Sequence, residues 1–130
     1  MPRRRVIWCV GPVLACLLDL LLTLHGQPVA YWHGDYEQVM ELNPLGSWLL
    51  QGHPLLFATG GLVWLAVVVV LILRLPRTFA LPLAFVVQAA HTLGAASWLL
   101  RAGVGGAMEA LVLLLVSSWW LHRTWPRERP

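Results

Sequence analysis

Three ionisable side chains stand inside long apolar runs of this 130-residue chain: Asp19, His91 and Glu109. An ionisable group is costly inside a bilayer, so such residues usually face the interior of a helix bundle and mark functional sites. Two carboxylates and an imidazole would suit a divalent metal or a proton relay. A structural alternative stays open, in which His91 pairs with one of the acids and holds the helices in register.

The apolar runs that carry these residues are the elements that must position them. Each is close to the roughly 20 residues that a helix needs to cross the hydrocarbon core. Lipid offers the backbone no hydrogen-bond partner, so each run must be helical. We expect spans over about 6–24, 54–75, 79–100 and 103–122. The predicted fold class is all-α: a polytopic membrane protein with one transmembrane domain, residues 1–130, built as a bundle of four transmembrane helices.

The composition excludes most soluble classes of protein. Hydrophobic residues make up 58% of the chain and charged residues 12%, against about 25% charged in an average soluble domain. Intrinsic disorder is excluded because disordered chains are poor in apolar residues. The basic residues punctuate the apolar runs and do not gather on one polar face, so we predict no nucleic-acid partner. The expected partners are the lipid bilayer and either another membrane protein or further copies of this chain.

The arginines predict the orientation. All 9 basic residues are Arg, and a cytoplasmic N-terminus places every one except Arg101 on the inner side. This strong positive-inside bias predicts an integral protein of the inner (cytoplasmic) membrane with both termini cytoplasmic. The alternative is a lipoprotein signal cleaved before Cys16, which we disfavour because the residues after Cys16 stay strongly apolar.

In this topology the three ionisable residues lie in the outer half of the membrane. At 1.5 Å per residue, Asp19, Glu109 and His91 lie roughly 8, 9 and 13 Å from the outer ends of their helices. Thr23 and Gln88 share small-and-polar stripes with Asp19 and His91. We therefore predict one intramembrane polar cluster: Asp19, Thr23, Gln88, His91 and Glu109.

Residues 26–53 form the one long connection, which is predicted to lie outside. The loop contains acidic residues and no Lys or Arg. Asp35 is expected to cap a short helix that runs to Leu42. Asn43 and Pro44 are expected to begin a second, interfacial helix, because Asn caps well and Pro suits the first helical position.

The loop also supplies candidate site residues. A re-entering loop would lower Glu41 or Asn43 toward Asp19 and close a site there, with His53 above the same layer. The alternative is that Asn43 only caps its helix and Glu41 is solvated.

Two short strings carry a resemblance to a known family. Leu18-Asp19-Leu20-Leu21-Leu22-Thr23, followed by Glu41-Leu42-Asn43-Pro44-Leu45, resembles an uncharacterised family (a domain of unknown function) of small prokaryotic multi-pass membrane proteins. That family has an Asp and a Thr late in its first helix and Glu-x-Asn-Pro after it. The resemblance covers about residues 13–100, and this chain differs by a longer insert and a fourth span. It implies that the motif residues form one unit, and it names no reaction.

Two function classes follow from these observations. The first is a non-enzymatic binding or accessory subunit whose polar cluster orders the helices. The second is an intramembrane metal- or proton-dependent site, enzymatic or not, in which Asp19, His91 and Glu109 hold the metal. No catalytic residue is assigned, because neither H-E-x-x-H nor G-x-S-x-G occurs. The cofactor stays undefined beyond that divalent metal.

Overall fold

The computed structural model describes residues 2–125, with side chains described from residue 5 onward. Four long helices dominate it: α1 (Pro2–His25), α4 (Pro54–Arg74), α5 (Arg77–Leu99) and α6 (Gly103–Thr124). Two short helices, α2 (Val29–Trp32) and α3 (Pro44–Gly52), lie in the loop, and the 3-10 turn η1 (Leu100–Ala102) joins α5 to α6. No strand occurs within residues 2–125. The predicted all-α class is confirmed.

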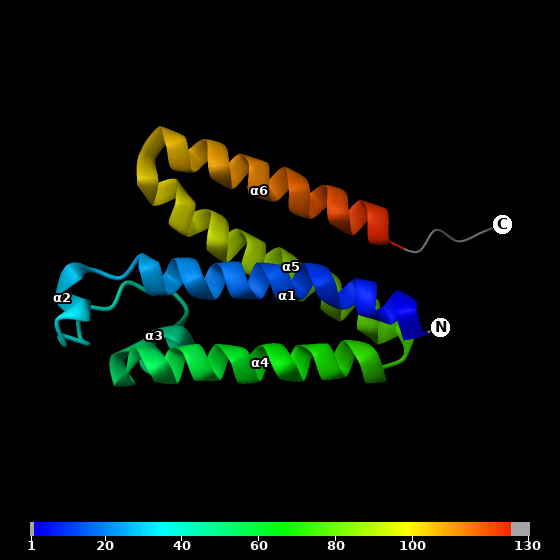
Figure 1. The fold of residues 1–130 in the computed structure, drawn as a ribbon, viewed down its shortest axis with the longest axis horizontal. Helices are drawn as coiled ribbons and strands as arrows, with labels where there is room; N and C mark the ends of the chain where they lie inside the picture. The colour runs from blue at the N-terminus through cyan, green and yellow to red at the C-terminus, as the bar shows by residue number, and fades with distance from the viewer. Residues whose placement is uncertain (1, 126–130) are drawn as a thin grey trace.

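Three segments are long and apolar enough to cross a membrane. They are Arg5–His25, Pro54–Arg74 and Arg77–Thr124. The third segment contains α5, η1 and α6, which turn back on themselves as a hairpin (Figure 1). The fold is therefore that of an all-helical membrane protein with three candidate spanning segments.

Helix α5 is the central element of the bundle. It packs against α1, α4 and α6, and in Figure 1 it crosses behind α1 while α4 runs antiparallel to α1. The core between α1, α4 and α5 is made of small and branched side chains: Cys9, Cys16, Val68, Ile72, Ala84 and Val87. Small residues let helix backbones approach closely where the hydrophobic effect contributes little.

Arg5 ties one end of the bundle together. Its guanidinium donates to the carbonyl oxygens of Leu73 and Leu75, at 2.8 and 3.1 Å. These two carbonyls lie where α4 ends and the chain turns toward α5, and a helix end leaves such carbonyls without a helical partner. The start of α1, the α4–α5 turn and the end of α6 thus lie at one end, and the loop and η1 lie at the other (Figure 1).

Of the two helices predicted in the loop, the structure confirms one and contradicts the other. Helix α3 begins as expected, with Pro44 in its first turn and Asn43 accepting from the amides of Leu45 and Gly46. The helix predicted from Asp35 to Leu42 is wrong: the chain forms α2 earlier and only turns after Gly34. Gly34 has φ 98°, a left-handed conformation that ends a helix.

Tyr31 attaches the loop to α3. Its side chain is completely buried, and its hydroxyl donates to the carbonyl oxygen of Leu50 at 3.0 Å. That carbonyl would normally accept from residue 54, but Pro54 has no N–H. Burial raises the pKa of Tyr31 above its ordinary value of 10.0, and the charge of Tyr36 raises it further. The neutral, hydrogen-bonded phenol is therefore the form that the fold holds.

Candidate functional site

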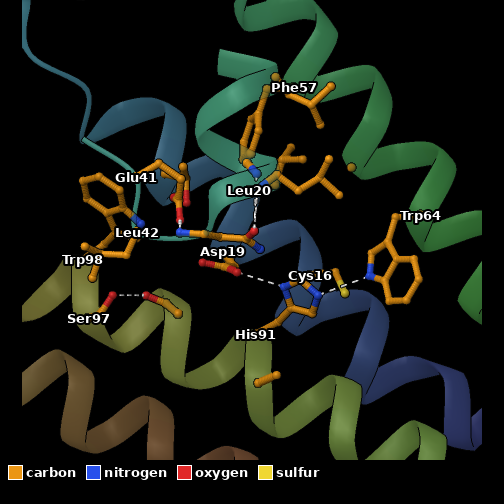
Figure 2. Close-up of a pocket in the computed structure, with 18 of the residues that line it drawn as sticks. Cys16, Asp19, Leu20, Glu41, Leu42, Phe57, Trp64, His91, Ser97 and Trp98 are labelled. Atoms are coloured by element: carbon orange, nitrogen blue, oxygen red, sulfur yellow. Dashed lines mark hydrogen bonds and ion pairs between the residues drawn. The ribbon is translucent and has the colours of Figure 1, made fainter. Parts of the chain in front are cut away.

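Asp19 and His91 meet across the α1–α5 interface. Nδ1 of His91 lies 2.8 Å from Oδ2 of Asp19, and the two side chains are 28% and 20% exposed. From α4, the indole N–H of Trp64 donates to Nε2 of His91 at 3.4 Å. Both contacts fit the tautomer with its proton on Nδ1, which donates to Asp19 and leaves Nε2 as an acceptor. One imidazole thus connects three helices (Figure 2).

Gly94 makes this meeting sterically feasible. A Cβ atom at this position would lie 2.7 Å from both carboxylate oxygens of Asp19. Real Cβ atoms do not approach other heavy atoms so closely, so the carboxylate fills the space that any larger residue would need. Sequence reasoning missed Gly94, although it follows His91 by three positions and therefore shares its helix face.

The Asp19–His91 pair lies in the wall of a cavity of about 590 Å³. Volumes of this size are typical of small-molecule sites. Helices α1, α4 and α5 form its sides, and α3 with the preceding loop residues covers it. The polar and charged side chains that line it are Asp19, Thr23, Glu41, Asn43, His91, Ser97 and Arg101.

Loop residues Glu41 and Asn43 do reach this cavity. Both line it together with Asp19, as the re-entering loop predicts. Oε1 of Glu41 accepts the backbone N–H of Asn43 at 2.7 Å, while Oδ1 of Asn43 caps α3. Asn43 therefore caps α3 and forms part of the cavity wall, and Glu41 stabilises the turn that leads from Glu41 to Asn43.

Aromatic side chains are a second part of the site that sequence reasoning missed. Phe57 and Trp64 on α4 and Trp98 on α5 line the cavity with its polar groups. The guanidinium carbon of Arg101 lies 3.9 Å from the centroid of the Trp98 ring, a cation–π contact. The available signal was that Phe57 and Trp98 lie within about one turn of the outer ends of α4 and α5, at the end of the bundle where Asp19 lies on α1.

Three predicted members lie elsewhere. Glu109 is exposed on α6, which packs inward through its neighbours Gly106 and Ala110. Gln88 is buried but faces α6, where its Nε2 donates to Oγ of Ser117 at 2.9 Å. His53 caps α4 by accepting the Leu55 N–H on Nδ1 at 3.1 Å and does not line the cavity. The single five-residue cluster is thus wrong, because depth along a helix does not specify which face meets a neighbour.

The predicted metal set fails for the same reason. Asp19 and His91 are together, but Glu109 is not with them. Within residues 2–125, no three His, Cys, Asp or Glu side chains lie close enough together to hold a metal ion. What the arrangement offers chemically is an acid–imidazole pair beside a largely apolar, aromatic-walled space.

The fold and the cavity define an all-helical membrane protein with a polar pair in the wall of an open cavity. Comparison with family models, with curated proteins and with solved structures gave no match.

Proposed function

We propose that this chain is a four-span membrane protein of the non-enzymatic binding class, and that its ligand occupies the cavity beside Asp19 and His91. The observation that carries the proposal is the cavity of about 590 Å³, with an apolar aromatic wall and a few convergent polar groups. Such a combination is the usual form of a small-molecule site.

Four crossings follow if α5 and α6 each span the membrane. They contain 23 and 22 residues, enough for about 30 Å of hydrocarbon each. Between them the chain reverses at Gly103, whose φ of 75° suits glycine. The described arginines Arg5, Arg74, Arg77 and Arg123 gather at the end that we assign to the cytoplasm, while Arg127 and Arg129 lie outside the described residues.

Thiol labelling in intact cells tests this topology. In a chain without its two cysteines, Glu37→Cys should react with a membrane-impermeant maleimide added from outside, and Arg77→Cys should react only after permeabilisation. The opposite pattern would overturn the cytoplasmic assignment of both termini. Reaction of both positions before permeabilisation would show that no membrane separates them, and it would contradict the proposed topology.

The two native cysteines test whether the cavity admits a ligand. Cys9 and Cys16 are almost equally buried, at 7% and 6% exposed, but only Cys16 lines the cavity. N-ethylmaleimide should therefore modify Cys16 well before Cys9, as read by mass spectrometry of the peptides. Filling the cavity with Gly60→Leu should remove this difference, whereas Gly105→Leu on the open face of α6 should not. Equal reaction of Cys9 and Cys16 in the unmodified chain would contradict an open cavity.

A binding protein of this size fits an accessory subunit of a larger membrane complex. We also propose that the motif residues shared in the resemblance to small prokaryotic membrane proteins act as one unit. Four of them, Asp19, Thr23, Glu41 and Asn43, line the cavity, which supports a common role in one site.

The second candidate is a proton-dependent site, favoured by the 2.8 Å contact between Asp19 and His91 in the cavity wall. A ligand that displaces His91 from Asp19 would change the protonation of the pair. Uptake or release of protons on ligand binding, measured in a weakly buffered solution, should then occur in the unmodified chain and disappear in Asp19→Asn. Ligand binding without any exchange of protons would leave only the first candidate.

A further inference from the structure

The charges of the cavity wall indicate the class of ligand, and this step rests on the proposed binding function. We propose that the cavity binds a lipophilic cation: an apolar molecule that carries one protonated amine or a quaternary onium group, with the positive charge at Glu41 and Asp19 and the apolar body against the aromatic wall.

The carboxylates carry the first part of the argument. Asp19 and Glu41 line the same cavity, one from α1 and one from the loop that covers it. Oδ2 of Asp19 binds His91, and Oε1 of Glu41 binds the Asn43 amide. Each carboxylate therefore uses one oxygen in the contacts described, and its other oxygen is available to a donor in the cavity. An ammonium group, with no acceptor atoms, suits such a position.

The one guanidinium in the wall does not reverse this balance. Arg101 lies over the Trp98 ring, and among the described residues the ion pair is that of His91 with Asp19. Glu41 thus lines the cavity without a basic partner, and its described contact is with the Asn43 amide. The loop above adds Asp35 and Glu37 and holds no Lys or Arg over residues 26–53. A low-dielectric site under an acidic surface concentrates cations and repels anions.

The aromatic wall carries the second part of the argument. Phe57, Trp64 and Trp98 line the cavity beside the carboxylates. The faces of aromatic rings attract a cation within about 6 Å of the ring centroid, and Trp does so most strongly. Arg101 over Trp98 already shows one such contact in this wall. An apolar cation gains both from the ring faces and from leaving water, whereas a small hydrated ion gains from neither.

Binding of radiolabelled tetraphenylphosphonium to the full chain in a nonionic detergent tests the proposal. Tetraphenylborate has the same shape with the opposite charge, and triphenylphosphine oxide is a neutral control. We expect saturable binding of the cation, with competition by unlabelled cation and none by the oxide. The borate forms an ion pair with the cation in solution, so it is labelled and tested by itself, and we expect it not to bind. Competition by phosphatidylethanolamine would assign the site to a lipid amine headgroup, and its absence would assign the site to a free organic cation.

Glu41→Gln is the diagnostic variant. Its amide oxygen still accepts the Asn43 N–H, so the loop keeps its geometry while the charge is lost, and we expect affinity for the cation to fall about tenfold. Asp35→Asn removes a loop charge that does not line the cavity, and it should leave affinity within about twofold. Equal losses of affinity in both variants would show that the cation responds only to the overall negative charge of the loop. That result would overturn the placement of the ligand's positive charge at Glu41.

The two proposals fail in different ways. If the borate or the neutral oxide binds as well as the cation, the cavity remains a binding site and the cationic class is overturned. If none of the three probes binds, while Cys16 and Cys9 react equally with maleimide, the binding function itself fails.

Discussion

Gly94 leaves the space that the carboxylate of Asp19 occupies: a Cβ atom at residue 94 would lie 2.7 Å from both Oδ1 and Oδ2. Helix α5 therefore presents an imidazole and, one turn later, a gap on the same face. The acid from α1 enters that gap and meets Nδ1 of His91. This close contact between α1 and α5 is thus also part of the cavity wall.

Gly94→Ala should weaken the packing of α1 on α5. The added methyl group must push the Asp19 carboxylate aside, and overpacking of this kind costs about 1–3 kcal/mol. Thermal unfolding in detergent measures the loss. Gly105→Ala is the matched control, because nothing lies within 4 Å of its Cβ position, and alanine favours a helix. Equal melting temperatures for the two variants would contradict the close contact.

Asp19 and His91 should show an energetic coupling. A double-mutant cycle with Asp19→Asn and His91→Gln isolates the pair, and contacting residues usually couple by about 0.5–3 kcal/mol. The same cycle with Asp19→Asn and Gln88→Leu is the control, because Gln88 faces α6 and bonds Ser117. We expect that second cycle to be additive. Coupling of the same size in both cycles would indicate a general loosening of the bundle.

Gln88→Leu should lower the stability of the bundle without changing its affinity for a ligand. It removes donation to Oγ and the carbonyl of Ser117, at 2.9 and 3.2 Å, and leaves the part-buried Ser117 hydroxyl with Thr92 alone. The loss is expected to be about 0.5–1.5 kcal/mol. Tetraphenylphosphonium affinity should not change, since Gln88 does not line the cavity. A parallel loss of affinity would show that the α5–α6 contact shapes the cavity.

Tyr31→Phe should loosen the loop that covers the cavity. It leaves the Leu50 carbonyl without its donor, and Pro54 cannot replace it, so we expect a local cost of about 1–3 kcal/mol. Faster hydrogen exchange in α3 measures the effect. Tyr36→Phe is the control, because it keeps the ring that packs against Tyr31 and His53. Unchanged exchange in Tyr31→Phe would show that packing alone holds the loop.

The raised pKa of Tyr31 adds a pH dependence with a defined sign. Burial and the charge of Tyr36 raise the pKa of Tyr31 above 10.0, so the folded loop retains this proton to higher pH than the unfolded chain. The contribution to loop stability is therefore complete below pH about 10 and is lost as the pH rises through the folded pKa. Protection factors in α3, which correct for the base-catalysed intrinsic exchange rate, should fall in that range for the natural chain and stay constant for Tyr31→Phe.

Local chemistry made several features predictable from sequence. Apolar runs of spanning length predicted the long helices because lipid leaves a backbone no other partner. Asn43 and Pro44 predicted the start of α3, because a cap and a preset φ act within a few residues. The position of Glu41 and Asn43 above Asp19 was also predictable, since all three lie near the same end of the bundle.

One prediction failed for a local reason, and the others needed information from beyond the local chain. Gly34, next to Asp35, takes a left-handed conformation after α2, and the helix expected from Asp35 did not form. Glu109 has the depth of Asp19, but the rotation of α6 about its axis depends on how Gly106 and Ala110 pack against the rest of the bundle. Gln88 lies on α5 with His91 and still bonds a different helix.

The sequence by itself determined that this chain forms apolar helices, where most of them begin and end, and at what depth its few ionisable groups lie. Only the tertiary structure decided that Asp19 meets His91 while Glu109 does not, and that three aromatic rings complete the cavity. The physical reason is that a helix in lipid is specified by its own backbone hydrogen bonds and apolar side chains. Contact between helices depends instead on how each helix is rotated and packed against its neighbours.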